Sequence, residues 1–160
     1  MDDLRVSLVQ GETRWRDPAG NRAYYANLIA PLQGASDLVL LPETFTSGFS
    51  NDAIDDAETM DGPSVEWMRA QAATLGAAVT GSVQLRVDDG AGGSGVFNRL
   101  LLATPEGALH SYDKRHLFRY AGEHERYAAG RERLTVEWKG WRICPQVCYD
   151  LRFPVFSRNR

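Results

Sequence analysis

The feature that most constrains the fold is the run Asp-Leu-Val-Leu-Leu at residues 37–41. Apolar residues in unbroken succession, without alternation, are typical of a strand covered on both faces. Residues 4–10 alternate apolar and polar side chains and predict an earlier strand. Between them, Asp17 and Pro18 predict a helix cap and first helical residue, and residues 22–32 continue at helical spacing. The order strand, helix, strand predicts a βαβ unit with parallel strands. The expected apolar face of this helix consists of Tyr25, Leu28, Ile29 and Leu32.

The middle of the chain predicts a second helix and a meander of antiparallel strands. The helix should run from residue 62 to residue 75, and strands are expected at 77–87, 96–104 and 108–112. The segment Asp-Asp-Gly-Ala-Gly-Gly-Ser-Gly at 88–95 predicts a flexible hairpin connection. It lacks the Gly-Lys-Ser/Thr ending of a phosphate-binding loop, which argues against nucleotide binding. The expected apolar face of the second helix consists of Val65, Met68, Ala72 and Leu75.

A last hairpin precedes the cysteine on which the functional argument depends. Two strands at 134–138 and 141–147 are joined by the two-residue turn at 139–140. The apolar run that ends this hairpin predicts a buried strand, and Asp150 is expected to cap a following helix.

Cys148 therefore lies at a strand-to-helix junction, as in a nucleophile elbow. The positive end of the helix dipole would favour its thiolate. The alternative is that Cys148 is a small buried hydrophobic residue, as free cysteines often are.

Composition argues against several classes of protein. A length of 160 residues fits a single domain, 1–160, and a net charge of −3 gives no indication of a nucleic-acid or membrane partner. No apolar run is long enough to span a membrane, and the first residues lack a signal-peptide profile. We therefore expect a cytoplasmic protein with free thiols at Cys144 and Cys148. No metal or cofactor is expected, because Cys and His lack zinc spacing. A metal site built from scattered histidines is the less favoured alternative: His110, His116 and His124.

Two charged residues follow predicted strands in positions suited to chemistry. Glu43 comes directly after the strand at 37–41, and Lys114 follows the strand at 108–112. In open α/β sheets, ligands bind beyond the carboxyl ends of the strands. The alternatives are a solvated loop acid and a charged turn. The long polar segment 119–133 is typical of functional loops.

These residues carry a resemblance to a known family. Leu-Pro-Glu-Thr-Phe (41–45), Tyr-Asp-Lys-Arg-His-Leu-Phe (112–118) and Cys-Tyr-Asp-Leu-Arg-Phe-Pro (148–154) resemble the Glu, Lys and Cys motifs of the nitrilase, or carbon–nitrogen hydrolase, superfamily in order and spacing. Together with Phe-Thr-Ser-Gly-Phe at 45–49, they are most similar to the omega-amidase branch, which hydrolyses the terminal amide of 2-oxoglutaramate and 2-oxosuccinamate. The resemblance implies an α/β fold, an α-β-β-α sandwich with mixed sheets. Because many members are nearly twice as long, it also implies that these residues are the first portion of a longer protein or a truncated form.

The resemblance implies a role for each of the three motif residues. Cys148 attacks the carboxamide carbon and forms a thioester, and Glu43 transfers protons. Lys114 and the backbone N–H after Cys148 stabilise the oxyanion. The implied partners are a small-molecule amide, water and a second copy of the chain in a homodimer.

Further residues are assigned supporting roles by the same resemblance. A second glutamate, Glu123 or Glu125, positions the amide or the lysine, and spacing to Gly130 favours Glu123. Tyr149 is expected to support the site. Arg152 would bind a substrate carboxylate, with an ion pair inside the fold as the alternative.

Three alternative functions stay open at this point. One is another branch of the superfamily, such as an N-carbamoyl amidohydrolase or an amidase acting on deaminated glutathione. The second is a non-catalytic scaffold that binds a partner. The third is a thiol redox protein that uses Cys144 and Cys148, although Cys144 is expected to be a packing residue.

Overall fold

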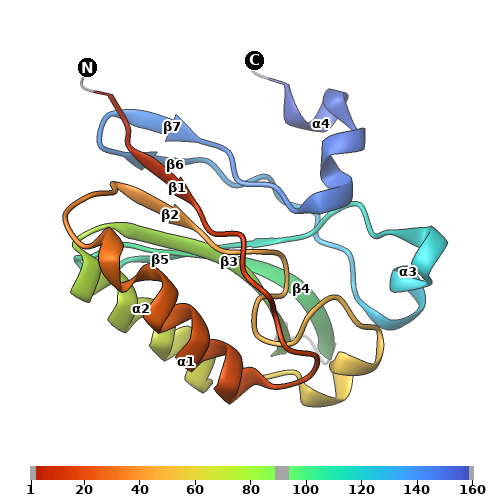
Figure 1. Cartoon of the computed structure of the whole chain (residues 1–160). Helices are drawn as coiled ribbons and strands as arrows, with labels where there is room; N and C mark the ends of the chain where they lie inside the picture. The colour runs from red at the N-terminus through yellow and green to blue at the C-terminus, as the bar shows by residue number, and fades with distance from the viewer. Residues whose placement is uncertain (1–2, 89–93, 159–160) are drawn as a thin grey trace.

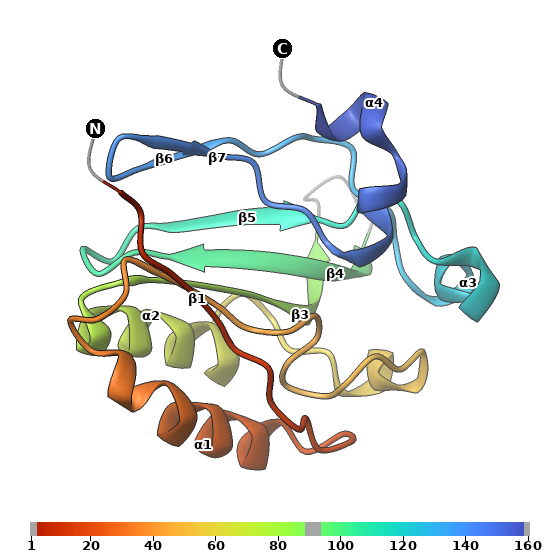
Figure 2. The same ribbon diagram turned by 45° about the horizontal axis from the view of Figure 1, so that its top comes forward.

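The computed structural model describes residues 3–88 and 94–158 and has three layers (Figures 1 and 2). Helices α1 (Pro18–Ile29) and α2 (Pro63–Leu75) cover one face of a five-stranded sheet. The hairpin of β6 (Val136–Trp138) and β7 (Trp141–Ile143) lies over the other face. The predicted hairpin connection at 88–95 falls, except at its ends, outside the described residues.

The five-stranded sheet is mixed, with the strands in sequence order. The first three strands pair in parallel, and the third, fourth and fifth pair antiparallel. This confirms both the βαβ start and the later meander. The strands are β1 (Val6–Leu8), β2 (Leu38–Leu40), β3 (Ala78–Asp88), β4 (Ser94–Ala103) and β5 (Leu109–Asp113).

Helix α1 begins where the sequence predicts. The Asp17 side chain accepts a hydrogen bond from the Gly20 N–H at 2.9 Å, and Pro18 is the first helical residue. Its buried stripe is Asn21, Tyr25 and Ile29, each four residues from the last. The prediction for Leu28 was wrong, since this side chain is 41% exposed. A stripe that repeats every four residues places Leu28 beside the buried face rather than on it. For α2, the whole predicted face is buried.

The core fills both faces of β2, as its unbroken apolar run predicts. Val39 packs with the α1 and α2 side chains, whereas Leu38 packs with Val136 beneath the hairpin. Gly81 does not interrupt β3, which continues through it. A Cβ at Gly81 would lie 2.8 Å from the Leu41 Cβ, so glycine permits a close approach at the end of β2.

Asp37 anchors the hairpin to the large sheet. Its carboxylate bonds Lys139 Nζ at 2.6 Å and Arg5 Nη2 at 3.0 Å, and its carbonyl accepts the Trp138 indole N–H at 2.8 Å. Lys139 and Gly140 both have positive φ, at 49° and 81°, which is the backbone of a type I′ hairpin turn. The predicted two-residue turn is confirmed.

Replacing Asp37 by asparagine should lower the melting temperature by a few degrees at pH 7. Hydrogen bonds, first from Arg5 and then from Lys139, hold the pKa of Asp37 well below its usual value. A depressed pKa stabilises the fold above the unfolded value of about 4, and this contribution is lost as the pH falls through the folded value. The difference between wild type and Asp37→Asn should therefore shrink on acidification. Thermal denaturation from pH 7 to pH 3 measures it, with exposed Asp61→Asn as control. A pH-independent difference would contradict this account.

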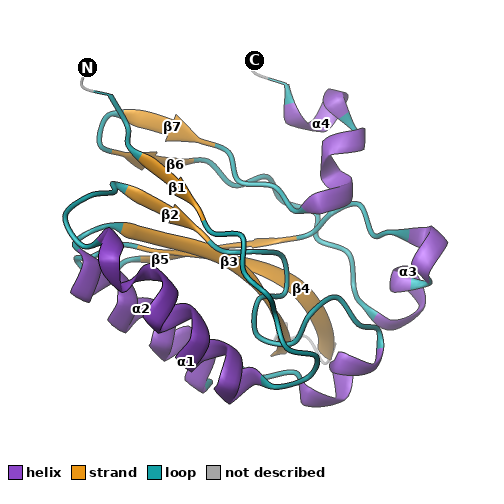
Figure 3. Cartoon of the chain, in the orientation of Figure 1, coloured by secondary structure: helices purple, strands orange, loops and turns teal. Residues whose placement is uncertain are grey.

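Short helices complete the chain, and all of them except the one directly after α1 lie at one end of the sheet (Figure 3). They are η1 (Ala30–Leu32), η2 (Asp52–Asp56), η3 (Arg119–Ala121), α3 (Glu123–Arg126), η4 (Cys148–Arg152) and α4 (Pro154–Ser157). The prediction of a strand through residue 147 was wrong, because β7 ends at Ile143. Pro145 has no N–H to donate to a neighbouring strand, which disfavours further pairing. Among the described residues, no helix combines the length and apolar character needed to cross a membrane.

Candidate active site

Glu43, Lys114 and Cys148 converge although they are far apart in the sequence. Glu43 follows β2, Lys114 follows β5, and Cys148 is the first residue of η4. Lys114 Nζ lies 2.8 Å from Glu43 Oε1. Glu43 and Cys148 line the same cavity of about 130 Å³ between the end of β2 and the segment before η4. The carboxyl ends of strands thus bring together an acid, an amine and a thiol, as the sequence predicts.

Lys114 is fully buried between two carboxylates. Glu123, also fully buried, places Oε2 at 2.9 Å from Lys114 Nζ, and the Phe49 ring centre lies 5.3 Å from the same nitrogen. Burial alone would lower the pKa of Lys114, but the charges of Glu43 and Glu123 and their hydrogen bonds outweigh it, so the pKa is raised. Glu125 is exposed. Of the two glutamates that the sequence left open, Glu123 is the one beside the lysine.

The polar segment after β5 is folded back so that Glu123 reaches Lys114. The Gly130 N–H donates to the Lys114 carbonyl at 3.0 Å. A Cβ at Gly130 would overlap the Asp113 carbonyl, so only glycine fits this approach. The Phe118 N–H donates to Glu123 Oε2, which orients the carboxylate from its own segment. This close approach explains why residue 130 is glycine. In the sequence, Gly130 served only to favour Glu123 by its spacing.

The backbone is strained at Thr44, directly after Glu43, and at Cys148 itself. Thr44 and Cys148 each have φ of +46°, a conformation that residues with a Cβ rarely adopt. The Thr44 N–H donates to Ser82 Oγ at 2.8 Å, which holds the turn after Glu43. Such outliers cluster at functional sites. Cys148 thus stands exposed on a strained turn at the start of η4, but β7 already ends at Ile143, so the predicted direct junction of strand and helix is not formed.

The Cys148 thiol is not ionised by its position at a helix start. Burial raises the pKa of Cys148 to about 11, and the charge of Glu43 and a hydrogen bond to it act in the same direction. Lys114 lowers it, but by less. The expectation of a thiolate favoured by a helix dipole was wrong, because η4 is a single short turn of 3₁₀ helix with a carboxylate beside the sulfur. The thiol needs a base.

Asp150 holds the turn that carries Cys148, but not as the predicted N-cap. It is the third residue of η4, is fully buried, and its Oδ2 accepts from the Val147 N–H at 3.2 Å and from Tyr112 Oη at 2.7 Å. Its Oδ1 accepts from the His116 N–H at 2.9 Å and lies 2.7 Å from His116 Nδ1. The carboxylate therefore ties this turn to the end of β5.

The two supporting residues predicted after Cys148 are not brought to the cavity. Tyr149 packs its ring against Phe118 and Phe153, with centroids 5.1 and 5.4 Å away. Arg152 is exposed and forms no ion pair with any described residue, so the alternative of an ion pair inside the fold is wrong, and binding of a substrate carboxylate stays a prediction. Cys144 is partly buried on the segment before η4, and both cysteines are free.

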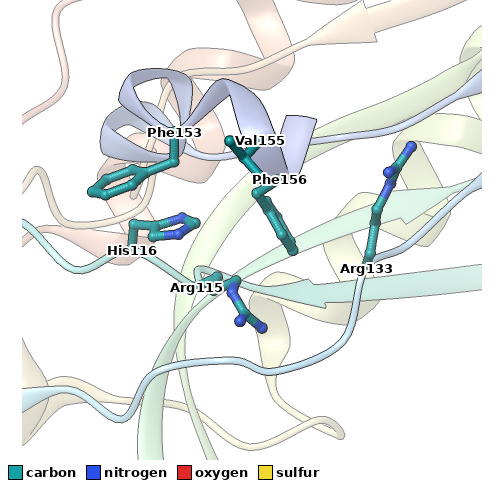
Figure 4. A pocket seen from close by; sticks show the side chains of 6 residues that line it. All are labelled: Arg115, His116, Arg133, Phe153, Val155 and Phe156. Atoms are coloured by element: carbon teal, nitrogen blue, oxygen red, sulfur yellow. The ribbon is translucent and has the colours of Figure 1, made fainter. Parts of the chain in front are cut away.

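A separate cavity of about 410 Å³ lies beside α4 (Figure 4). In it, the His116 ring stacks on Phe153, with centroids 3.8 Å apart, and the Arg115 guanidinium lies 5.0 Å from the Phe156 ring centre. None of the three converging groups lines it. Among the described residues, no group of three or more His, Cys, Asp or Glu side chains could hold a metal ion.

Sequence reasoning missed one residue of the site, Asn98. Its Nδ2 group donates to Glu43 Oε1 at 2.8 Å and to Glu123 Oε1 at 3.3 Å. The only indication in the sequence is that an amide stands within the largely apolar strand at 96–104. A polar residue on a buried strand requires partners, which the pattern does not identify.

Comparison with known proteins agrees with this geometry. The profile of the family described as carbon-nitrogen hydrolase matches residues 5–159. The omega-amidase YafV of Yersinia enterocolitica is 46% identical over 160 residues, which cover 100% of this chain and 60% of that protein. The 2-oxoglutaramate amidase of Bacillus subtilis (strain 168) is 31% identical over 157 residues, covering 96% of this chain and 59% of that protein.

A solved structure gives the same result for the fold. The crystal structure of XC1258 from Xanthomonas campestris, a CN-hydrolase superfamily protein with an arsenic adduct in the active site, matches with a TM-score of 0.96 and 75% identity. The match covers 100% of this chain and 58% of that chain, so the expected mixed α/β fold is confirmed. The chain spans about 60% of the length of the curated relatives it matches. With a family profile that matches almost every residue and a site that unites the family's three motifs, the chain belongs to the carbon-nitrogen hydrolase family of the nitrilase superfamily.

Proposed function

We propose that this protein hydrolyses a small ω-amide, such as 2-oxoglutaramate or 2-oxosuccinamate, to the 2-oxo dicarboxylate and ammonia. The single observation that carries the proposal is the convergence of Glu43, Lys114 and Cys148 at the carboxyl ends of the strands. The names of the relatives, an omega-amidase and a 2-oxoglutaramate amidase, support the substrate class. We further propose that residues 1–160 belong to one catalytic domain.

In the first half-reaction, Glu43 takes the proton of the Cys148 thiol as the sulfur attacks the amide carbon. The tetrahedral oxyanion accepts hydrogen bonds from Lys114 Nζ and from the backbone N–H that follows Cys148. Glu43 then gives the proton to the leaving nitrogen, the C–N bond breaks, and ammonia departs from a thioester on Cys148. Lys114 suits this role because its raised pKa keeps it charged at neutral pH.

In the second half-reaction, Glu43 removes a proton from water, which attacks the thioester carbon. The C–S bond breaks, the proton returns to sulfur, and the carboxylic acid leaves. Each cycle thus consumes one amide and one water and releases one acid and one ammonia. Glu123 holds Lys114 throughout, since both side chains are fully buried and in contact.

The test is ammonia release from a panel of amides, with the thioester trapped on the protein and mapped by mass spectrometry. We expect turnover of 2-oxo ω-amides and an acyl adduct on Cys148. Turnover of an N-carbamoyl amino acid or a nitrile, with no turnover of 2-oxo ω-amides, would favour another branch of the superfamily. Iodoacetamide labelling of Cys144 that abolishes turnover while Cys148 stays unlabelled would contradict the choice of nucleophile.

We also propose a homodimer and a cytoplasmic location, both from the resemblance of the motifs. Sedimentation of the purified chain measures the first, and cell fractionation measures the second. A monomer at all concentrations would contradict the dimer without bearing on the chemistry of the site.

A further inference from the structure

Asn98 lies at the centre of the site although it belongs to none of the three motifs. It stands on β4 and is 1% exposed. Its backbone carbonyl accepts the Lys114 N–H at 3.0 Å. Its side-chain nitrogen donates to Glu43 at 2.8 Å and to Glu123 at 3.3 Å. One residue therefore contacts every member of the buried ionic network.

The chemistry of the amide restricts what Asn98 can do there. Ionised carboxylates only accept hydrogen bonds, so the amide presents nitrogen, and each of its two N–H groups serves one glutamate. Its carbonyl oxygen is left buried without a hydrogen-bond partner among the described residues. Buried polar atoms without partners are uncommon in native proteins. The residue thus leaves its acceptor unused while both donors point at the carboxylates.

Both donors that bond Glu43 contact the same carboxylate oxygen. The two donors, Lys114 Nζ and Asn98 Nδ2, both bond Oε1 of Glu43 at 2.8 Å. Neither bonds Oε2, so Oε2 is the oxygen left for a proton from Cys148. The titratable groups that face Glu43 from the described elements are Lys114 after β5, Glu123 on α3 and Cys148 on η4.

We propose that Asn98 is a positioning residue, which fixes the Glu43 and Glu123 carboxylates around Lys114 and keeps Glu43 in its proton-accepting form. The inference rests on the proposed role of Glu43 as the base. Its physical basis is that a hydrogen bond donated to a carboxylate favours the ionised form. An amide supplies that bond at every pH, because it does not titrate.

Two variants test this. Asn98→Leu removes both donors at similar volume, and Asn98→Asp keeps the shape but replaces the donors by an acceptor. The readout is the carboxyl ¹³C shift of Glu43 against pH, assigned with Glu43→Gln. We expect the midpoint to rise in Asn98→Leu relative to the wild type, because a hydrogen bond donated to the charged form is lost. The rise should be larger in Asn98→Asp, because a negative charge is added.

Asn21→Leu is the matched control. Asn21 is also fully buried, and its amide nitrogen also serves two acceptors, the carbonyls of Arg14 at 2.7 Å and Thr46 at 2.8 Å. It does not contact the glutamates, so the Glu43 midpoint should match the wild type. If Asn98→Leu does not fold, the titration of the isosteric Asn98→Asp variant tests the proposal. Midpoints unchanged in the folded Asn98 variants, or raised equally by Asn21→Leu, would overturn the proposal.

Kinetics separate this inference from the proposed function. In an active protein, Asn98→Leu should lower kcat by ~10-fold with little change in KM, and the acid limb of the pH profile should follow the ¹³C midpoint. If no amide is hydrolysed by the wild type, the proposed function fails, and the ¹³C titration still tests the contact. A rise in KM as large as the expected fall in kcat, with kcat itself unchanged, would show that Asn98 serves substrate binding. That result would overturn its role as a positioning residue.

Discussion

Replacing Glu43 by glutamine is expected to lower kcat for amide hydrolysis by ~10²–10⁴-fold, the range typical for loss of a general base. The structural reason is the state of the nucleophile. With the pKa of Cys148 at about 11, only about one thiol in 10⁴ is ionised at pH 7 without help. Glu43 contacts Lys114 at 2.8 Å and shares a cavity with the sulfur, so it is the base in reach. Glutamine keeps the shape of the side chain but cannot accept the proton.

The same substitution should make Cys148 easier to ionise. Burial raises the pKa of Cys148 most, but the charge of Glu43 comes next, while Lys114 acts in the opposite direction. Without the carboxylate, the attraction of Lys114 is less opposed, and the pKa of Cys148 should fall below about 11. Iodoacetamide labelling of Cys148 against pH measures this shift. Because damage to the fold would also relieve the burial that raises the pKa of Cys148, the shift is assigned to the lost charge only if the melting temperature of Glu43→Gln matches that of the wild type.

Glu125→Gln is the control for both measurements. Glu125 is two residues from Glu123 on the same short helix, but its side chain is exposed. We expect turnover and the labelling profile to match the wild type. If Glu43→Gln kept turnover within threefold of the wild type, or if its thiol became less acidic, Glu43 would not be the base.

The parts of the fold that the sequence predicts are those fixed by local chemistry. Asp17 and Pro18 define a helix start through their own backbone and side-chain geometry. The turn at 139–140 forms because glycine tolerates a positive φ and closes a tight hairpin. The apolar run 37–41 requires cover on both faces, which the helices and the hairpin supply. Each of these depends on neighbours within a few residues or on burial alone.

Most errors and omissions of the sequence-based predictions occur where contacts with residues distant in the chain determine the structure. Asp150 reads as a helix cap in the sequence, yet its partners Tyr112 and His116 lie more than thirty residues away in the chain. Asn98 reads as one polar residue in a strand, and its role depends on two glutamates from other elements. Tertiary contacts of this kind override propensity. The strand predicted through residue 147 is a different kind of error, because Pro145 is a local signal against further pairing.

The three motif residues were predicted from the sequence for a different reason. Their order and spacing form a pattern that local physics does not explain, but that a family resemblance does. Physical reasoning added only that each follows a strand. The state of each group could be determined only from the folded arrangement. Examples are the neutral thiol of Cys148 and the contact of Lys114 with two carboxylates.

Replacing Lys114 by methionine is expected to reduce the free energy of unfolding by ~3–5 kcal/mol, as removal of one partner from a buried ionic group does. Methionine fills a similar volume, so the main change is electrostatic. Two carboxylates, one fully buried, lose the cation between them. For a domain of this size the melting temperature should fall by about 10 °C. Lys139→Met is the control, because this lysine also bonds a carboxylate but is 48% exposed, and such pairs contribute about 0–1 kcal/mol.

The difference in stability between wild type and Lys114→Met should depend on pH in one direction. The folded pKa of Lys114 is raised, so its stabilising contribution is fully present below the unfolded value of about 10.4 and is lost as the pH rises through the folded value. The difference between wild type and Lys114→Met should thus be fully present below about pH 10 and should shrink as the pH rises further. Adding Glu123→Gln to the variant removes one of the opposed charges and should restore ~1 kcal/mol or more. A double variant no more stable than Lys114→Met would mean that packing, not charge, sets the loss.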